Sequence, residues 1–294
     1  MRWRSGRRSD NVEDLRGQRA PGGFGGSSAL GRVLPLLIRT RIGRIVLIFG
    51  ALIYFGARLL GIDLFQVTSA PPNEGQTGRA LSAQDQELAD FVSVVLADTE
   101  QTWHQQFTAR NRTYVEPKLV LFRDAVRSAC GLGQAAMGPF YCSGDQKLYI
   151  DLGFYEQMKN QLGAPGDFAQ AYVIAHEVGH HVQTLLGTSG KVREAQQRLS
   201  QVDANQLSVR LELQADCYAG IWGHHADRER QIVEMGDLDE AINAASAIGD
   251  DTLQQQAGGR VRPESFTHGT AQQRMEWFRR GYDSGRLESC DTFQ

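Results

Sequence analysis

Two histidines, His176 and His180, lie four residues apart, and Glu177 follows the first, which gives the pattern H-E-x-x-H. The surrounding segment, residues 168–186, carries apolar side chains at helical spacing and is predicted to be a helix. Residues four apart on a helix share one face, about 6 Å apart along the axis. The two imidazoles can therefore bind one metal ion, with the Glu177 carboxylate in reach of a water molecule beside it.

A match of five residues is a weak signal alone, because a helix with surface histidines and a solvated glutamate also fits it. Two features favour a metal site. The neighbours Val173, Ile174 and Val178 are apolar, which is typical of an interior helix face. Gly179 costs about 1 kcal/mol relative to alanine in a helix, a cost consistent with a site that needs close approach.

A catalytic zinc ion needs a third protein ligand and one open position. His181 follows His180 directly and points about 100° away from it. Glu212 is the better candidate, on a helix predicted over residues 204–225. One turn later, Asp216 can accept the N–H of a ligand histidine. An exposed acidic pair is the alternative, but the helix is apolar over most of its circumference, and buried carboxylates need a cation or hydrogen-bond donors.

The combination of His176-Glu177-x-x-His180 with Glu212-x-x-Ala215-Asp216 resembles the gluzincin metallopeptidases, and more specifically the bacterial putative neutral zinc metallopeptidase family. The matching segments cover roughly residues 80–294. The resemblance implies a zincin-like α+β domain that is predominantly helical, a bound Zn²⁺ ion and hydrolysis of a peptide or protein substrate. The further matching segments are Ala129-Cys130-Gly131, Gly138-Pro139-Phe140-Tyr141-Cys142, Leu148-Tyr149-Ile150-Asp151-Leu152 and Phe266-Thr267-His268-Gly269-Thr270.

Gluzincins carry a histidine, tyrosine or arginine beyond the third ligand, which stabilises the charge that develops on the substrate carbonyl oxygen. Such a donor can contribute several kcal/mol to the chemical step. His268 matches this position, just before a helix predicted over residues 271–282. It can also be an ordinary loop histidine beside Thr270, a suitable N-cap. Four tyrosines compete for the same role: Tyr141, Tyr149, Tyr155 and Tyr218.

Residues 147–152 alternate in character and follow a turn at residues 143–145, which predicts a strand. In zincin-type folds the edge strand above the metal pairs with an extended peptide. The segment is therefore expected to be an edge strand, which either holds substrate or is purely structural.

The four cysteines all lie after the apolar segment that ends at residue 62, and their even number indicates disulfides in a translocated domain. Cys130 and Cys142 flank a glycine-rich loop, so a local bridge is expected there. The remaining pair, Cys217 and Cys290, would connect the helix of Glu212 to the C-terminal tail. The chain has no C-x-x-C spacing, so the cysteines are not expected to form a structural zinc site.

The net charge of −3 gives no reason to expect nucleic-acid binding. The charge is unevenly distributed, however. Residues 1–43 are arginine-rich and include a glycine-rich run, which predicts a disordered tail.

The next segment is apolar. Residues 45–57 carry no charge, and if the segment extends to residue 62, with Arg58 at the membrane interface, it has the length of a membrane-spanning helix. A cleaved signal sequence and a buried core helix are the alternatives.

The predicted organisation is therefore a basic cytoplasmic tail (1–43), a transmembrane helix (44–64), a linker (65–80) and a zincin-like metallopeptidase domain (81–294). The positive-inside rule places the N-terminus in the cytoplasm and the catalytic domain outside it, in the periplasm or extracellular space. Apolar periodicity predicts further elements: a strand at 119–122 and helices over 81–107 (N-cap Ser82), 190–201, 227–234 and 237–248.

The predicted function is that of a membrane-anchored zinc peptidase with Glu177 as general base. Two other functions stay open. The protein could be a membrane-tethered binding or scaffold protein without proteolytic activity, or a zinc hydrolase of a non-peptide amide.

Overall fold

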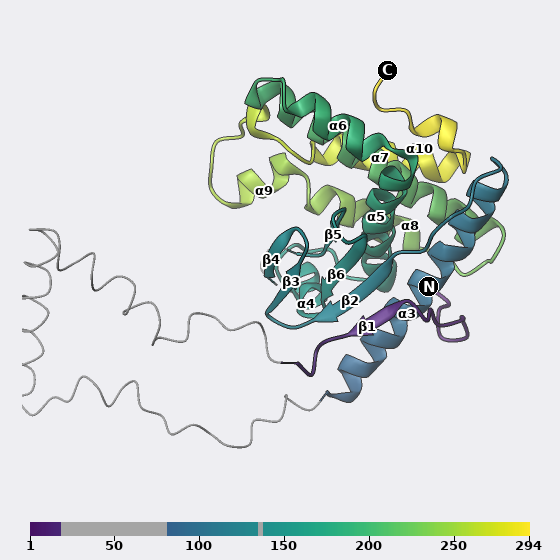
Figure 1. Ribbon diagram of the computed structural model, residues 1–294. Helices are drawn as coiled ribbons and strands as arrows, with labels where there is room; N and C mark the ends of the chain where they lie inside the picture. Colours follow the sequence, from purple (N-terminus) through teal and green to yellow (C-terminus); the bar gives the residue numbers. More distant parts are fainter. Residues whose placement is uncertain (19–80, 135–137) are drawn as a thin grey trace, which may run out of the picture. The chain divides into compact units, whose positions relative to one another are not determined.

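The computed structural model describes residues 1–18, 81–134 and 138–294 (Figure 1), and their fold is α+β and mostly helical, as expected. The strands are β1 (Val12–Asp14), β2 (Lys118–Phe122), β3 (Ala125–Ser128), β4 (Gly131–Gln134), β5 (Phe140–Cys142) and β6 (Lys147–Asp151). The helices are α3 (Ala83–Thr108), α4 (Gly153–Asn160), α5 (Asp167–Leu186), α6 (Thr188–Gln196), α7 (Gln201–Arg228), α8 (Asp237–Ala247), α9 (Asp250–Gln256) and α10 (Ala271–Ser284), with 3-10 turns η2 (Pro263–Ser265) and η3 (Leu287–Cys290).

Four of the strands form one sheet in the order β1-β2-β6-β5, and β3 and β4 form a separate hairpin. β1, β2 and β6 run parallel, while β5 pairs antiparallel with β6. The prediction of an edge strand at 147–152 is wrong, because β6 pairs with a strand on each side. Its residues from Leu148 to Asp151 are all buried. Among the described strands the two edges of this sheet are β1 and the short β5, and β5 contacts α5.

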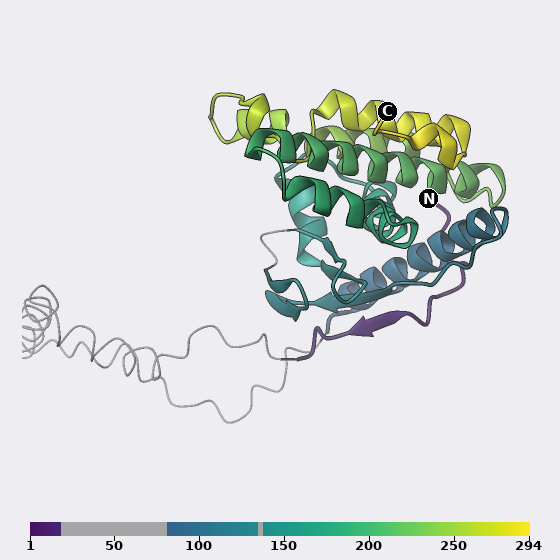
Figure 2. The same ribbon diagram turned by 45° about the horizontal axis from the view of Figure 1, so that its top comes forward.

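Most of the core forms between the sheet and the helices α3, α5, α7, α8 and α10. α5 is the central element, since it contacts α3, α6, α7, α8 and the strands β5 and β6. α7 and α10 lie side by side beyond α5 (Figure 2). Capping boxes begin two helices, with Ser82 and Asp85 at α3 and Thr270 and Gln273 at α10. Thr270 is thus the N-cap that the sequence suggested.

The predicted helices agree with the observed ones over most of the domain, but not everywhere. The expected separate helix at 227–234 does not form, because α7 continues to Arg228 and the chain then turns. Helices α4 and α9 were not predicted. Both are short, with eight and seven residues, and α9 has no fully buried residue, so neither leaves a strong apolar pattern in the sequence.

The first residues of the chain are an integral part of this domain. Met1–Arg16 and Leu81–Gln294 form one compact unit, and β1 extends the sheet beside β2 (Figure 1). Ser9 and Asn11 both donate to the buried carboxylate of Glu100. The buried Arg16 donates to the backbone carbonyl of Asp85. The expected disordered tail over 1–43 is therefore wrong for its first sixteen residues.

The predicted membrane topology must also be corrected. No helix in the part of the chain that the structure describes is long and apolar enough to cross a membrane. The segments expected to be a transmembrane helix (44–64) and a linker (65–80) lie outside the described residues. An N-terminus on one side of a membrane and a catalytic domain on the other is incompatible with the ladder between β1 and β2, since two paired strands share one compartment.

Both expected disulfides are present. Cys130 pairs with Cys142, and this bond links the β3–β4 hairpin to the edge strand β5. Cys217 pairs with Cys290, and this bond connects α7 to η3 near the C-terminus. The prediction of two structural disulfides is confirmed.

The close packing of α7 and α10 generates a first prediction. A Cβ atom on Gly281 would collide with the carbonyl oxygen of Cys217, so Gly281→Ala should lower the free energy of unfolding by about 1–3 kcal/mol. In Gly190→Ala, on α6, the new methyl group meets no atom within 4 Å, and the stability should rise by about 0.5–1 kcal/mol. Urea unfolding of both variants measures the difference, and an unchanged midpoint for Gly281→Ala would contradict the packing.

Candidate metal centre

The site is built where α5 and α7 approach each other. Gly179 of α5 lies against Ala215 of α7, such that a Cβ on Gly179 would stand 3.0 Å from the Ala215 carbonyl oxygen and 3.1 Å from its Cα. Ala215 lies between Glu212 and Asp216 in the chain. The glycine therefore allows the backbone of α7 to come close enough for both carboxylates to reach the histidines of α5.

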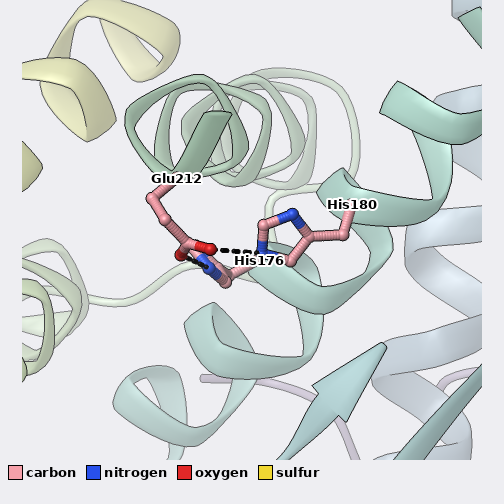
Figure 3. Close-up of side chains that lie close together, drawn as sticks. All are labelled: His176, His180 and Glu212. Carbon is pink, nitrogen blue, oxygen red and sulfur yellow. Dashed lines mark hydrogen bonds and ion pairs between the residues drawn. The ribbon is translucent and has the colours of Figure 1, made fainter. Parts of the chain in front are cut away.

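Three possible ligands converge there. Nε2 of His176 lies 3.1 Å from Oε2 of Glu212, and Nε2 of His180 lies 3.4 Å from Oε1 of the same carboxylate. The three side chains point toward one another (Figure 3), and their donor atoms all lie within 4.8 Å of one another. Ligands about 2.0–2.1 Å from a tetrahedral zinc ion are separated by roughly 3.3 Å. The donor set and its spacing fit zinc.

The tautomers of both histidines are set by their other ring nitrogens. Nδ1 of His176 lies 2.8 Å from Oδ1 of Asp216, and Nδ1 of His180 lies 2.9 Å from Oε1 of Gln183. A carboxylate and an amide oxygen only accept hydrogen bonds, so each Nδ1 donates its hydrogen. Nε2 is then the ring nitrogen that each histidine directs to Glu212, and it becomes a metal ligand when an ion replaces its proton.

Asp216 is held in a fully buried network of its own. Arg274 of α10 donates two hydrogen bonds to its carboxylate, at 2.8 and 2.9 Å. The hydroxyl of Tyr172 donates a third, at 2.5 Å. A buried carboxylate with this many donors stays ionised and fixed in position. The network therefore connects α5, α7 and α10 directly behind the His176 ring.

The electrostatics of the site favour a cation. Burial opposes the ionisation of Glu212, but the two histidines outweigh it and hold the pKa of Glu212 well below its usual range. Burial likewise opposes a charge on His176, yet the Asp216 carboxylate outweighs it and raises the His176 pKa to about 10. A site that binds protons this strongly between carboxylates is also suited to a divalent ion.

Glu177 faces the same space. The residue is only 7% exposed, and among the described residues no side chain donates a hydrogen bond to its carboxylate. It lines a cavity of about 520 Å³, termed here the metal cavity, together with His176, His180, Glu212 and His268. A larger cavity of about 730 Å³ lies beside Cys290 and contains none of these groups. We take the metal cavity as the candidate site because, of these two cavities along the described residues, it is the one that combines the possible ligands with Glu177.

His268 reaches the metal cavity from the loop before α10. Its side chain is half exposed, and its Nδ1 lies 3.2 Å from Oδ1 of Asp250. The other oxygen of Asp250 accepts the backbone N–H groups of Thr267, His268 and Gly269. The hydrogen bond to Asp250 raises the pKa of His268. The loop conformation and the ring orientation of His268 thus both depend on Asp250.

Of the four competing tyrosines, only Tyr141 lines the metal cavity. Tyr149 donates to Asp145 instead, and Tyr155 and Tyr218 are buried elsewhere. Tyr141 of β5 lies 3.1 Å from Nδ1 of His181. The Nε2–H of His181 donates to the backbone carbonyl of Val115, so Nδ1 accepts from the Tyr141 hydroxyl.

A family model described as "Putative neutral zinc metallopeptidase" matches residues 1–293 of the chain. The chain belongs to this family. The match includes the N-terminal residues that pair with the sheet, although their composition predicts a separate tail. No solved structure is detectably similar to the chain.

Similar proteins occur in Escherichia coli and in two mycobacteria. "Uncharacterized protein YpfJ" of Escherichia coli K12 is 53% identical over 304 residues, which cover 100% of this chain and 99% of the relative. "Uncharacterized protein Mb2605" of Mycobacterium bovis and "Uncharacterized protein Rv2575" of Mycobacterium tuberculosis are each 43% identical over 190 residues, covering 61% of this chain and 63% of the relative.

Three residues of the site could not be found from the sequence. Arg274 and Asp250 lie far from the motif in the chain, and no spacing rule connects them to it. Gln183 follows His180 by one helical turn, which places it on the same face and was the one available signal. Asp216 was expected to accept from a ligand histidine, and the structure places it beside His176.

The hydrogen bond between Asp216 and His176 yields a second prediction. Asp216→Asn keeps the size of the side chain but removes its charge, and it should weaken zinc binding about 10–100-fold. Competition with a chromophoric chelator measures the affinity, with circular dichroism as a check on folding. Asp203→Asn, an exposed position on the first turn of α7, should leave the affinity unchanged. Equal zinc affinities in the two variants would show that Asp216 does not contribute to zinc binding.

Proposed function

We propose that the protein is a zinc-dependent peptidase with a zincin-like domain, in which His176, His180 and Glu212 hold the ion. One observation carries the proposal: three convergent ligand atoms share a cavity with Glu177, a carboxylate that has no hydrogen-bond donor among the described side chains. Membership in a family of zinc metallopeptidases supports the same conclusion.

Bound zinc would supply two things, a lowered pKa for a coordinated water and polarisation of the scissile carbonyl. The chain's own residues then act as follows. Glu177 accepts a proton from the attacking water, since its carboxylate is free to do so. Glu177 subsequently donates that proton to the departing amine. Asp216 and Gln183 keep the imidazoles of His176 and His180 in the orientation that ligation requires.

His268 is proposed to donate a hydrogen bond to the carbonyl oxygen as negative charge develops on it. Its Nδ1 is directed to Asp250, so Nε2 is the nitrogen available to substrate. The raised pKa keeps this imidazole protonated to a higher pH than a free histidine. A protonated donor stabilises a developing oxyanion more strongly than a neutral one.

The first test of the proposed function is Glu177→Gln. The amide cannot accept a proton, so kcat for a peptide substrate should fall about 10²–10⁴-fold while the zinc content stays at the wild-type level. A quenched-fluorescence peptide library with and without chelator provides the activity, and atomic absorption provides the metal content. Full activity of the variant would exclude Glu177 as the base.

The same library separates the alternative functions. A wild-type protein that binds zinc but cleaves no peptide would favour a binding or scaffold role. Chelator-sensitive hydrolysis of a non-peptide amide, without peptide cleavage, would favour the second alternative.

His268→Ala tests the proposed oxyanion donor. The variant should lose about 10²–10³-fold in kcat with little change in KM, because the hydrogen bond strengthens only as charge develops. Asp250→Asn should show a smaller loss of the same kind. His104→Ala is the matched control, since His104 is an exposed histidine whose partner is Glu116, and its activity should equal that of the wild type. A change in KM alone for His268→Ala would contradict the proposed role.

A further inference from the structure

Two cavities meet at the proposed metal ligands. The metal cavity, of about 520 Å³, extends from His180 and Glu212 toward α4 and α9. A second cavity of about 310 Å³, termed here the polar cavity, extends from the same two residues toward α6. Tyr141 on the edge strand β5 also lines both. A substrate with its scissile bond at His180 and Glu212 would therefore place neighbouring residues in two different environments.

The outer part of the metal cavity is mostly apolar. Away from the ligands, its walls are formed by Phe154, Leu162, Ile248 and Leu253, from α4, α9 and the segments that flank them, with Gln157 and Gln161 as the polar exceptions. Leu253 is 38% exposed, although it is a large hydrophobic residue. An apolar substrate side chain would cover this surface and remove it from water.

The polar cavity carries more polar groups. Its walls include Ser143, Gln196 and Arg193, beside the apolar Val192 and Leu211. Arg193 donates to the Ser143 hydroxyl, at 2.5 Å, so the guanidinium is tied to the end of β5. Within the described ranges, no carboxylate lies at ion-pair distance from Arg193. The one acidic residue that lines this cavity is Glu212, the proposed metal ligand.

Arg193 is exposed, lines a cavity that includes two of the proposed ligands, and has no acidic partner among the described residues. Such a guanidinium matches a carboxylate, to which it can donate two parallel hydrogen bonds. We propose that the peptide substrate presents a carboxylate to Arg193 in the polar cavity and an apolar side chain to the metal cavity, on opposite sides of the cleaved bond. This inference rests on the proposed peptidase function and specifies its substrate. The carboxylate is that of an aspartate or glutamate side chain, or the C-terminus of the substrate.

Reversing the charge of the substrate residue and of Arg193 tests whether Arg193 binds a substrate carboxylate. Peptides that differ only by Glu, Gln or Lys at each position, each with a free or an amidated C-terminus, are assayed with the full-length zinc-loaded protein. The wild type should favour the carboxylate about threefold to fivefold in kcat/KM, the range for an exposed ion pair. Arg193→Gln should abolish the preference, and Arg193→Glu should reverse it in favour of Lys. Arg198→Gln is the control, because Arg198 pairs with Glu194 and does not line the cavity.

The two sources of the carboxylate give different results. Loss of the preference on amidation identifies the substrate C-terminus, and loss on exchange of Glu for Gln identifies a side chain. An unchanged preference in Arg193→Gln overturns the inference. If peptide cleavage persists there and still requires Glu177, the proposed peptidase function stands. If the wild type cleaves no peptide at all, both fail.

The apolar side is tested separately at Leu253. Leu253→Asn should reduce the preference for Leu over Asn in the substrate at one position, about threefold or more, as expected when part of an apolar contact is lost. Leu199→Asn is the matched control, since Leu199 is 44% exposed and lines neither cavity. Folding is barely affected in either variant, because both side chains are exposed. An identical substrate profile for Leu253→Asn and the wild type overturns this half of the inference.

Discussion

The close approach of α5 and α7 at Gly179 is the constraint on which the site depends. The two helices carry all three proposed ligands, and the separation of those ligands is set by the distance between the helix backbones. Because Gly179 has no Cβ, the backbone of Ala215 lies against it, and Glu212 can reach both His176 and His180. A helical glycine is unfavourable by about 1 kcal/mol, and here that cost allows two carboxylates to face two imidazoles.

The geometry of the site also depends on a buried charge, the Asp216 carboxylate, which lies behind the proposed ligand His176. Asp216 is fully buried and would be strongly destabilising without partners. Arg274 and Tyr172 supply three donors, and His176 supplies a fourth. These partners come from helices that are far apart in sequence, so the carboxylate also holds α5, α7 and α10 in register. The network that orients a ligand histidine is therefore part of the domain core.

The N-terminal segment shows how composition can mislead. Its arginines suggested a solvated basic tail, because isolated positive charges in a glycine-rich context are typical of one. In the structure, Arg7 and Arg8 form ion pairs with Glu100 and Asp90 of α3, and Arg16 is buried beside Asp14. The acidic partners of the first two lie more than eighty residues away in the chain. The short strand β1 has only three residues, too few for a period-two pattern to be recognised.

The amino-acid sequence alone determined the local features: the helix that carries His176, Glu177 and His180 within about one turn, the caps at Ser82 and Thr270, and the candidacy of Glu212 and Asp216. These follow from spacing along one helix, which is a short-range property. Only the tertiary structure decided which strand is the edge, that residues 1–16 belong to the sheet, and that Arg274, Asp250 and Arg193 face the site. Those contacts join residues far apart in the chain, and their geometry depends on how whole helices and strands pack, which no local pattern encodes.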